Sequence, residues 1–194
     1  MKHLLTFLIF VSIFQICNAQ TTYAISADDG AKVSVKGNST LHEWEAVASE
    51  IIDHPTEITT DLAGNVGFEN FGFKVGVESL DGGRGASMNK KINKALVSST
   101  SPYIVYNATE VEFAPGSGDG ENMINSKGTL EIAGKSMDIV VDAKVKLEGE
   151  QLVISGSKAF KMSDFDIEPP TAMFGQIKTR DDITVHFEFR YDVK

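Results

Sequence analysis

The stretch STLHEWEA, residues 39–46, places His42 between two hydroxyl side chains and two glutamates. In a catalytic interpretation, Ser39 or Thr40 would be the nucleophile, His42 the base, and Glu43 or Glu45 the acid that orients it. Many hydrolases present such a serine in a Gly-x-Ser-x-Gly elbow, and the sequence contains no such elbow. The stretch therefore does not predict a catalytic residue.

A metal site is equally poorly supported by the histidines and the single cysteine. Apart from His3, the chain has His42, His54 and His186, and no two of them lie at ligand spacing on one predicted element. We therefore expect no metal and no required cofactor. The alternative role for residues 39–46 is structural: Thr40 and His42 would close a corner between two strands, and Trp44 would cover the end of a core, with contact to a ligand as a secondary option.

The N-terminal residues predict export. Residues 1–3 are basic, residues 4–14 form an apolar run, and small residues precede a cleavage site after Ala19. The run is shorter than the roughly 20 apolar residues of a membrane helix, and no later segment approaches that length. We therefore expect a signal peptide over residues 1–19 and a periplasmic or secreted protein with no transmembrane segment. A lipid anchor at Cys17 is the less favoured alternative, because Ile16 precedes it.

Charge and length narrow the function classes. The chain of 194 residues carries 18 basic and 27 acidic side chains, a net charge of −9, and loss of the leader removes one more base, Lys2. Such an acidic surface repels nucleic acid. Residues 20–194 are long enough for one domain with a sizeable core, and they contain no cysteine for a disulfide. The sequence leaves open whether this domain is a monomer or a homodimer.

Alternation of apolar and polar residues dominates the expected domain and predicts half-buried antiparallel strands. It is clearest over residues 183–193, 137–147 and 71–77, with shorter candidates at 32–37, 46–53, 65–69, 103–113, 127–133, 151–156 and 158–163. Turn residues at 28–30, 133–135, 148–150 and 179–182 separate these candidates. Residues 87–96 instead show helical spacing, with Ser87 placed to cap the helix. Residues 164–179, which contain Pro169 and Pro170, cannot form a central strand.

The fold class predicted from these elements is all-β: an antiparallel barrel of about eight strands with a short amphipathic helix. A sheet of this size with one apolar face must close on itself or pack against a second sheet. A closed barrel of about eight strands can hold one small ligand or be filled by its own side chains. Composition alone does not separate the hollow barrel from the packed one, and for an arbitrary barrel it favours the packed core.

Four stretches resemble the YceI family of exported, lipocalin-like proteins: NSTLHEWEA, LDGGRGASMNKKINKAL, GTLEIAGKSMDIVVDAKVKL and FKMSDFDIEPPTAMFGQIKTRDDITVHFEF. They occur in the family's order and span nearly the whole expected domain. The resemblance implies a lipocalin-like barrel with an elongated apolar tunnel that binds a polyisoprenoid, an isoprenoid quinone or a fatty-acid-like lipid. It therefore favours the hollow barrel.

The tunnel lining that the resemblance implies comes from the apolar faces of the predicted strands. These are Phe71, Phe73, Val75, Ile104, Tyr106, Leu130, Ile132, Ile139, Val141, Phe160, Met162, Val185, Phe187 and Phe189. The face is least certain over residues 103–111, where Tyr103, Val105 and Val111 compete with Ile104 and Tyr106, and a shift of one residue inverts it. Phe165, Met173 and Phe174 would close one end of the tunnel.

A local positive patch lies in an otherwise acidic chain. Between residues 82 and 101 the sequence has Arg84, Lys90, Lys91 and Lys94 and no acid. If the helix covers the mouth of the barrel, this patch could meet the anionic head group of a lipid, although a solvated helix face is the simpler interpretation.

Three functions remain open at this point. The first is a non-enzymatic protein that holds a long-chain apolar lipid for transport, storage or stress protection, which requires no catalytic residue. The second is a packed secreted barrel that binds a protein partner. The third, less favoured, is a lipid-modifying enzyme that uses His42, or Asp164 with Asp166, as acid or base.

Overall fold

The structure of this protein is a computed structural model that describes residues 21–27, 30–53, 56–60, 66–114 and 122–194. The predicted leader over residues 1–19 lies outside the described residues. So do two of the three residues in the predicted turn at 28–30, and His54.

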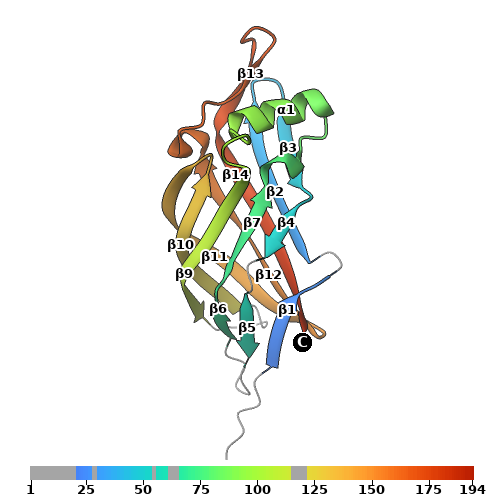
Figure 1. The fold of residues 1–194 in the computed structure, drawn as a ribbon, viewed down its shortest axis with the longest axis vertical. Coiled ribbons are helices and arrows are strands. Elements are labelled where there is room, and N and C mark those ends of the chain that lie inside the picture. Colours follow the sequence, from blue (N-terminus) through green and yellow to red (C-terminus); the bar gives the residue numbers. More distant parts are fainter. Residues whose placement is uncertain (1–20, 28–29, 54–55, 61–65, 115–121) are drawn as a thin grey trace, which may run out of the picture.

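Ten strands form a curled antiparallel sheet, and a short 3-10 helix, η1, connects two of them (Figure 1). They are β2 (Ala31–Ser39), β3 (Glu43–Ala48), β4 (Ile51–Asp53), β7 (Gly72–Gly76), η1 (Val77–Ser79), β8 (Leu80–Asp81), β9 (Tyr103–Ala114), β10 (Asn122–Ile132), β11 (Lys135–Glu148), β12 (Gln151–Lys161) and β14 (Ile177–Val193). The pairings run β7-β9-β10-β11-β12-β14-β2-β3. β3 then pairs with β8 and β4 pairs with β7, and the chain joins β7 to β8 through η1. With β3–β4 and β7–β8 each counted as one interrupted strand, this gives the predicted barrel of about eight strands.

Three further strands extend the sheet at the end where the C-terminus lies. β1 (Thr21–Ile25) pairs with the last residues of β14 and with β5 (Glu57–Thr60), which pairs in turn with β6 (Val66–Glu69). Figure 1 shows these strands at the end of the barrel opposite the helix. Tyr23 of β1, Ile58 of β5 and Tyr191 of β14 are buried.

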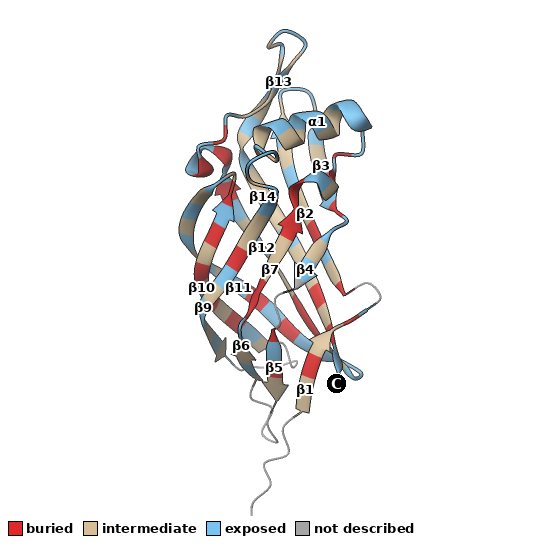
Figure 2. Ribbon diagram, viewed as in Figure 1, coloured by how far each residue is buried: buried red, intermediate tan, exposed pale blue. Residues whose placement is uncertain are grey.

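The predicted helix is α1 (Ala86–Ala95), and it lies across the other end of the barrel (Figure 1). Gly85, with φ of 77°, precedes it as the N-cap, so the prediction that Ser87 caps the helix was wrong. One side of α1 faces the barrel and the other faces water. The residues on the barrel side are only half-buried, so no residue of the helix is fully buried (Figure 2).

The two predicted strands over residues 151–163 are one strand, β12, whereas the single predicted strand over residues 46–53 is two, β3 and β4. The turn predicted at residues 179–182 was wrong, because these residues belong to β14. Their alternation of half-buried and exposed side chains continues that of the strand. A register irregularity against β2 between Thr179 and Ile183 accommodates this charged stretch as a bulge.

Residues 164–176 contain no central strand, as expected, but the prediction was wrong for residues 177–179, which begin β14. The 3-10 helix η2 (Met162–Phe165) ends at Asp166, whose φ is 56°. The two-residue strand β13 (Thr171–Ala172) then pairs with the start of β14 as a hairpin.

Residues 39–42 form the structural corner that the sequence analysis favoured. Ser39 Oγ accepts hydrogen bonds from the backbone N–H groups of Leu41 and His42, at 3.2 and 3.1 Å, and lies 3.0 Å from Nδ1 of His42. The Thr40 N–H donates to the Lys178 carbonyl at 2.9 Å, and the Lys178 N–H donates to Thr40 Oγ1 at 3.2 Å. These bonds fasten the β2–β3 turn to β14.

Removing the Ser39 hydroxyl tests this corner. We expect Ser39→Ala to lower the free energy of unfolding by about 1 kcal/mol, because the partly buried N–H of His42 and the exposed N–H of Leu41 lose their acceptor. Urea unfolding of the variant measures the loss, and Ser136→Ala, at an exposed strand position, is the matched control. A Ser39→Ala midpoint equal to that of Ser136→Ala would contradict this role.

Candidate ligand-binding cavity

A cavity of about 350 Å³ lies inside the barrel and beneath α1, and it is lined almost entirely by apolar side chains. The long barrel strands supply these side chains in alternation, with outward-facing residues between them. Every residue that the sequence analysis assigned to the tunnel wall lines this cavity, and so does Phe165. Ile104 and Tyr106 are the inward residues of β9, as chosen over Tyr103 and Val105.

Met173 and Phe174 do not line the cavity, so the prediction that they close one end was wrong. Both residues have positive φ, 50° and 54°, and form the turn of the β13–β14 hairpin. Their side chains are 65% and 109% exposed. The turn carries them past the end of the barrel, whereas Phe165 is buried and packs edge-on against Phe160, with ring centroids 5.8 Å apart.

The cavity occupies only part of the barrel. Ile58, Val145, Ile154 and Tyr191, toward β1, are at most 1% exposed and do not line it. Lining residues nearer to α1, such as Val141 and Val185, are half-buried. One barrel therefore combines a packed end and a hollow end.

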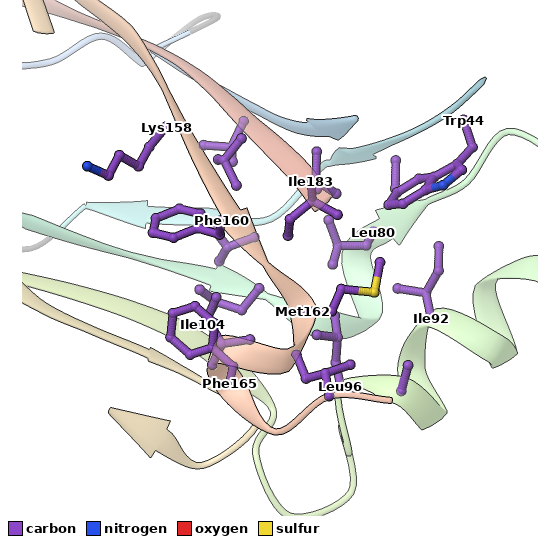
Figure 3. A pocket seen from close by; sticks show the side chains of 18 of the residues that line it. Trp44, Leu80, Ile92, Leu96, Ile104, Lys158, Phe160, Met162, Phe165 and Ile183 are labelled. Carbon is purple, nitrogen blue, oxygen red and sulfur yellow. The ribbon is translucent and has the colours of Figure 1, made fainter. Parts of the chain in front are cut away.

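The underside of α1 also lines the cavity, which was not predicted from the sequence. Met88, Ile92, Ala95 and Leu96 all line it, and Figure 3 shows Ile92 and Leu96 beside Met162 and Leu80. The helical spacing of these residues was recognised, and it was the signal that could have placed them. On β2 and β10, alternation could also have identified Val33, Val35 and Ile124.

Two polar side chains meet inside the cavity. The Tyr106 hydroxyl lies 2.7 Å from Ser126 Oγ, and both residues are buried. Burial raises the pKa of the Tyr106 phenol above its usual value, and the hydrogen bond with Ser126 opposes part of that rise. The Phe73 ring packs on Tyr106, with centroids 5.6 Å apart.

The charged residues that line the cavity are all basic. Arg84 and Lys91 line it at the α1 end and Lys158 lines it from β12, and no aspartate or glutamate is among the described lining residues. Lys90 and Lys94, the other two cations of the predicted patch, are exposed on α1 and do not line the cavity. The rim also includes His42 and Trp44, and the indole Nε1 of Trp44 is buried with no hydrogen-bond partner among the described residues.

The candidate acids and bases for an enzyme lie elsewhere. Asp164 accepts a hydrogen bond from the Lys161 N–H at 2.9 Å, and Asp166 forms an ion pair of 2.8 Å with Lys135. Both carboxylates are exposed and outside the cavity lining, and His186 is exposed on β14. Within the described part of the chain, no group of three or more His, Cys, Asp or Glu side chains could hold a metal ion.

The sequence profile of the YceI-like domain matches residues 15–191. The chain belongs to the YceI-like family. No curated protein sequence matches it.

Solved structures share its fold. BcnA from Burkholderia cenocepacia is 20% identical with a TM-score of 0.64, over 82% of this chain and 95% of that one. A YceI protein from Campylobacter jejuni is 20% identical with a TM-score of 0.59, over 77% and 84% of the two chains. A polyisoprenoid-binding domain from Saccharophagus degradans, implicated in plant cell wall breakdown, is 12% identical with a TM-score of 0.62, over 91% and 99%. At these identities the likeness establishes the fold alone.

No helix among the described residues of this YceI-like protein is long and apolar enough to cross a membrane.

The Tyr106 pKa gives a test of the polar pair. Because the folded-state pKa is raised, the stabilisation is complete below the ordinary tyrosine pKa of about 10 and is lost as the pH rises through the folded-state value. Tyr106→Phe should remove this alkaline loss, and at neutral pH it should cost about 1 kcal/mol, since Ser126 loses its partner. Urea unfolding at neutral and alkaline pH measures both effects.

The matched control is Tyr103→Phe, because Tyr103 is an exposed tyrosine on the same strand. It should keep the alkaline loss of the parent protein. Identical pH profiles for the parent and Tyr106→Phe would contradict the assignment.

Proposed function

We propose that this YceI-like protein is exported and holds one long-chain apolar lipid in its cavity, without chemical change, for transport, storage or stress protection. The ligand classes are a polyisoprenoid, an isoprenoid quinone and a fatty-acid-like lipid. The observation that carries the proposal is the cavity itself: about 350 Å³, with an apolar lining drawn from strands around the barrel and from the underside of α1. Its solved structural neighbours include a domain described as polyisoprenoid-binding.

The free energy of binding in such a site comes mainly from the apolar surface area that is removed from water. Each Å² of apolar surface removed from water contributes about 25 cal/mol, so several hundred Å² of lipid tail supply many kcal/mol before the cost of ordering the ligand. Tyr106 and Ser126 satisfy each other within the cavity. The remaining wall therefore suits a hydrocarbon chain.

Export is supported by residues 1–19, whose basic, apolar and small-residue segments have the pattern of a cleaved leader. The protein would then act in the periplasm or outside the cell, as a monomer or a homodimer. No cofactor is needed for binding.

The two alternatives have weaker support. A packed barrel that binds a protein partner does not account for the cavity. An enzyme would need an acid or base aimed at the ligand, whereas Asp164 and Asp166 are engaged outside the cavity. His42 lines the rim, but its ring lies 3.0 Å from the Ser39 hydroxyl that organises the corner.

The basic residues at the α1 end suggest how the lipid is oriented. Arg84 and Lys91 would face an anionic head group at the rim, with the tail inside the barrel. Lys90 and Lys94, which the sequence analysis grouped with them, would remain in solvent.

Native mass spectrometry tests the proposed function. The protein is exported from a bacterial host and purified without detergent, and any released molecule is extracted and identified. We expect one long-chain lipid per chain. Val185→Trp should reduce its occupancy by roughly tenfold, because the indole fills the cavity, whereas His186→Trp, on the opposite face of β14, should not. A bare protein that also fails to take up added quinone or fatty acid would overturn the proposal.

The head-group assignment has a test of its own. We expect Arg84→Gln with Lys91→Gln to weaken binding of a fatty acid by roughly three- to tenfold, because two exposed charge contacts are lost. Binding of the corresponding neutral alcohol should be unchanged. Lys90→Gln with Lys94→Gln, on the same helix, is the matched control. Equal losses for the acid and the alcohol would contradict the head-group role.

A further inference from the structure

The wall of the barrel is not continuous between β11 and β12. Their pairing runs from Glu148 opposite Gln151 to Ala143 opposite Gly156, and it ends there. Both strands continue: residues 135–142 of β11 pair with β10, and residues 157–161 of β12 pair with β14. All of these residues are described, and the two stretches do not pair with each other. We call the space between them the side slot.

Burial changes where the slot begins. On β11, the inward residues Ala143 and Val145, which lie where the strands pair, are 3% and 1% exposed. Ile139 and Val141, which lie along the slot, are half-buried although they line the cavity from the same face. Val185 on β14, which is paired on both sides, is equally half-buried, so this exposure reflects the cavity, and the slot is defined by the missing strand pairing.

One side chain crosses the slot. Lys158 on β12 lines the cavity, and its Nζ donates a hydrogen bond of 2.6 Å to the carbonyl of Val140 on β11. Had the ladder continued in register, Lys158 would stand opposite Val141 with backbone bonds between the strands. A side chain takes the place of those bonds. Figure 3 shows Lys158 extending away from Trp44 and from the helix residues Ile92 and Leu96.

A second contact closes the end of the slot nearest to η2. Lys135 Nζ on β11 forms an ion pair of 2.8 Å with Asp166, the residue that follows η2. Both side chains are substantially exposed, and exposed ion pairs contribute little stability. Two lysine contacts thus bridge the slot in place of a ladder of backbone hydrogen bonds, and η2, with Met162 and Phe165 buried, packs against both strands at its end.

At the α1 end, in contrast, polar contacts fasten the helix to the barrel. Asn89 Oδ1 accepts a hydrogen bond from the Gly82 N–H at 3.0 Å, and Asn89 Nδ2 donates to Asp81 at 3.2 Å. A carbon added at Gly82 would lie 2.8 Å from the Met88 side chain, so the helix and the β8 end are in close contact. Lifting α1 would break these contacts and expose its apolar underside.

We infer that lipids enter and leave the cavity through the side slot, and that Lys158 is the strap that closes it. This inference rests on the proposed function. Opening requires the Lys158 ammonium to leave one carbonyl for water, and the long apolar stem of lysine can swing with little cost. A hydrocarbon chain can then pass between two strands whose other edges stay paired, so the barrel remains folded.

Cross-linking the slot tests the inference. In the full chain with Cys17→Ser, Val140→Cys and Ala159→Cys place two thiols at exposed positions on opposite sides of the slot, and a short bis-maleimide joins them. Stopped-flow fluorescence measures the uptake rate of a fluorescent polyene fatty acid, and equilibrium titration measures its Kd. We expect the cross-link to slow uptake by about tenfold or more while leaving Kd within about twofold, because a closed gate alters both rates alike. The same double-cysteine protein without cross-linker is the matched control.

Lys158→Met tests the opposite effect, because it removes the contact that closes the slot. It keeps an apolar side chain of similar length and removes the ammonium, so we expect exchange of the corresponding neutral polyene alcohol, which has no charge for Lys158 to pair with, to become about threefold faster or more at a similar Kd. Lys161→Met, on the outward face of the same strand, should leave the rate unchanged. Unaltered rates in both the cross-linked protein and Lys158→Met would overturn the inference. Failure of the control protein to bind the probe at all would overturn the proposed function, and the inference with it.

Discussion

Closure of the sheet depends on two very short pairings. Only two residue pairs join β3 to β8, and three join β4 to β7. Ser79 bridges the interruption between them: its hydroxyl accepts the Glu50 N–H at 3.0 Å and donates to the Gly76 carbonyl at 2.8 Å. A carbon added at Gly76 would lie 2.2 Å from the Glu50 carboxylate, so glycine permits this approach. Without the β3–β8 and β4–β7 pairings, β3 and β7 would expose free edges, and the cavity would open to water along its length.

The same inward alternation produces a packed core at one end and a cavity at the other. Toward β1, the extra strands β5 and β6 cover the barrel, and Tyr191 and Ile154 fill it. Toward α1, glycines on the wall leave room: a carbon on Gly156 would lie 2.6 Å from the Phe187 ring, and one on Gly37 would lie 2.4 Å from the Trp44 indole. These rings fold against the wall and line the cavity. Whether a barrel is hollow depends on such three-dimensional details, which composition does not record.

Most barrel strands and their inward faces were predictable from the sequence because alternation on each strand is imposed by a single core, whereas the short strands β1 and β5 were not predicted. Irregularities were not. On β9, the register shift opposite Lys127 and Gly128 inserts one extra residue, so Tyr106 faces inward before it and Val111 and Phe113 pack toward the core after it. Of the competing residues, Ile104 and Tyr106 therefore face inward before the bulge and Val111 after it, whereas Tyr103 and Val105 do not. The start of β14 was predicted as a turn because its residues are charged. Met173 and Phe174 are exposed because they form the turn of the β13–β14 hairpin, which their apolar side chains do not indicate. The side slot has no sequence signature, since both strands alternate normally through it.

The distribution of charge ties these features together. On the outer face, acids meet bases across strands, as in Lys127 with Glu110 at 2.9 Å and Lys36 with Glu45 at 3.7 Å. Along the cavity the described lining has cations and no acid. A carboxylate in an apolar cavity would lose hydration without a partner, whereas a lysine carries its charge to the edge on an apolar stem. Lys158 does this at the slot, where its ammonium reaches a backbone carbonyl. In a chain of net charge −9, an anionic lipid is repelled by most of the outer surface, so the basic edges of the cavity are where its head group would meet the least opposition.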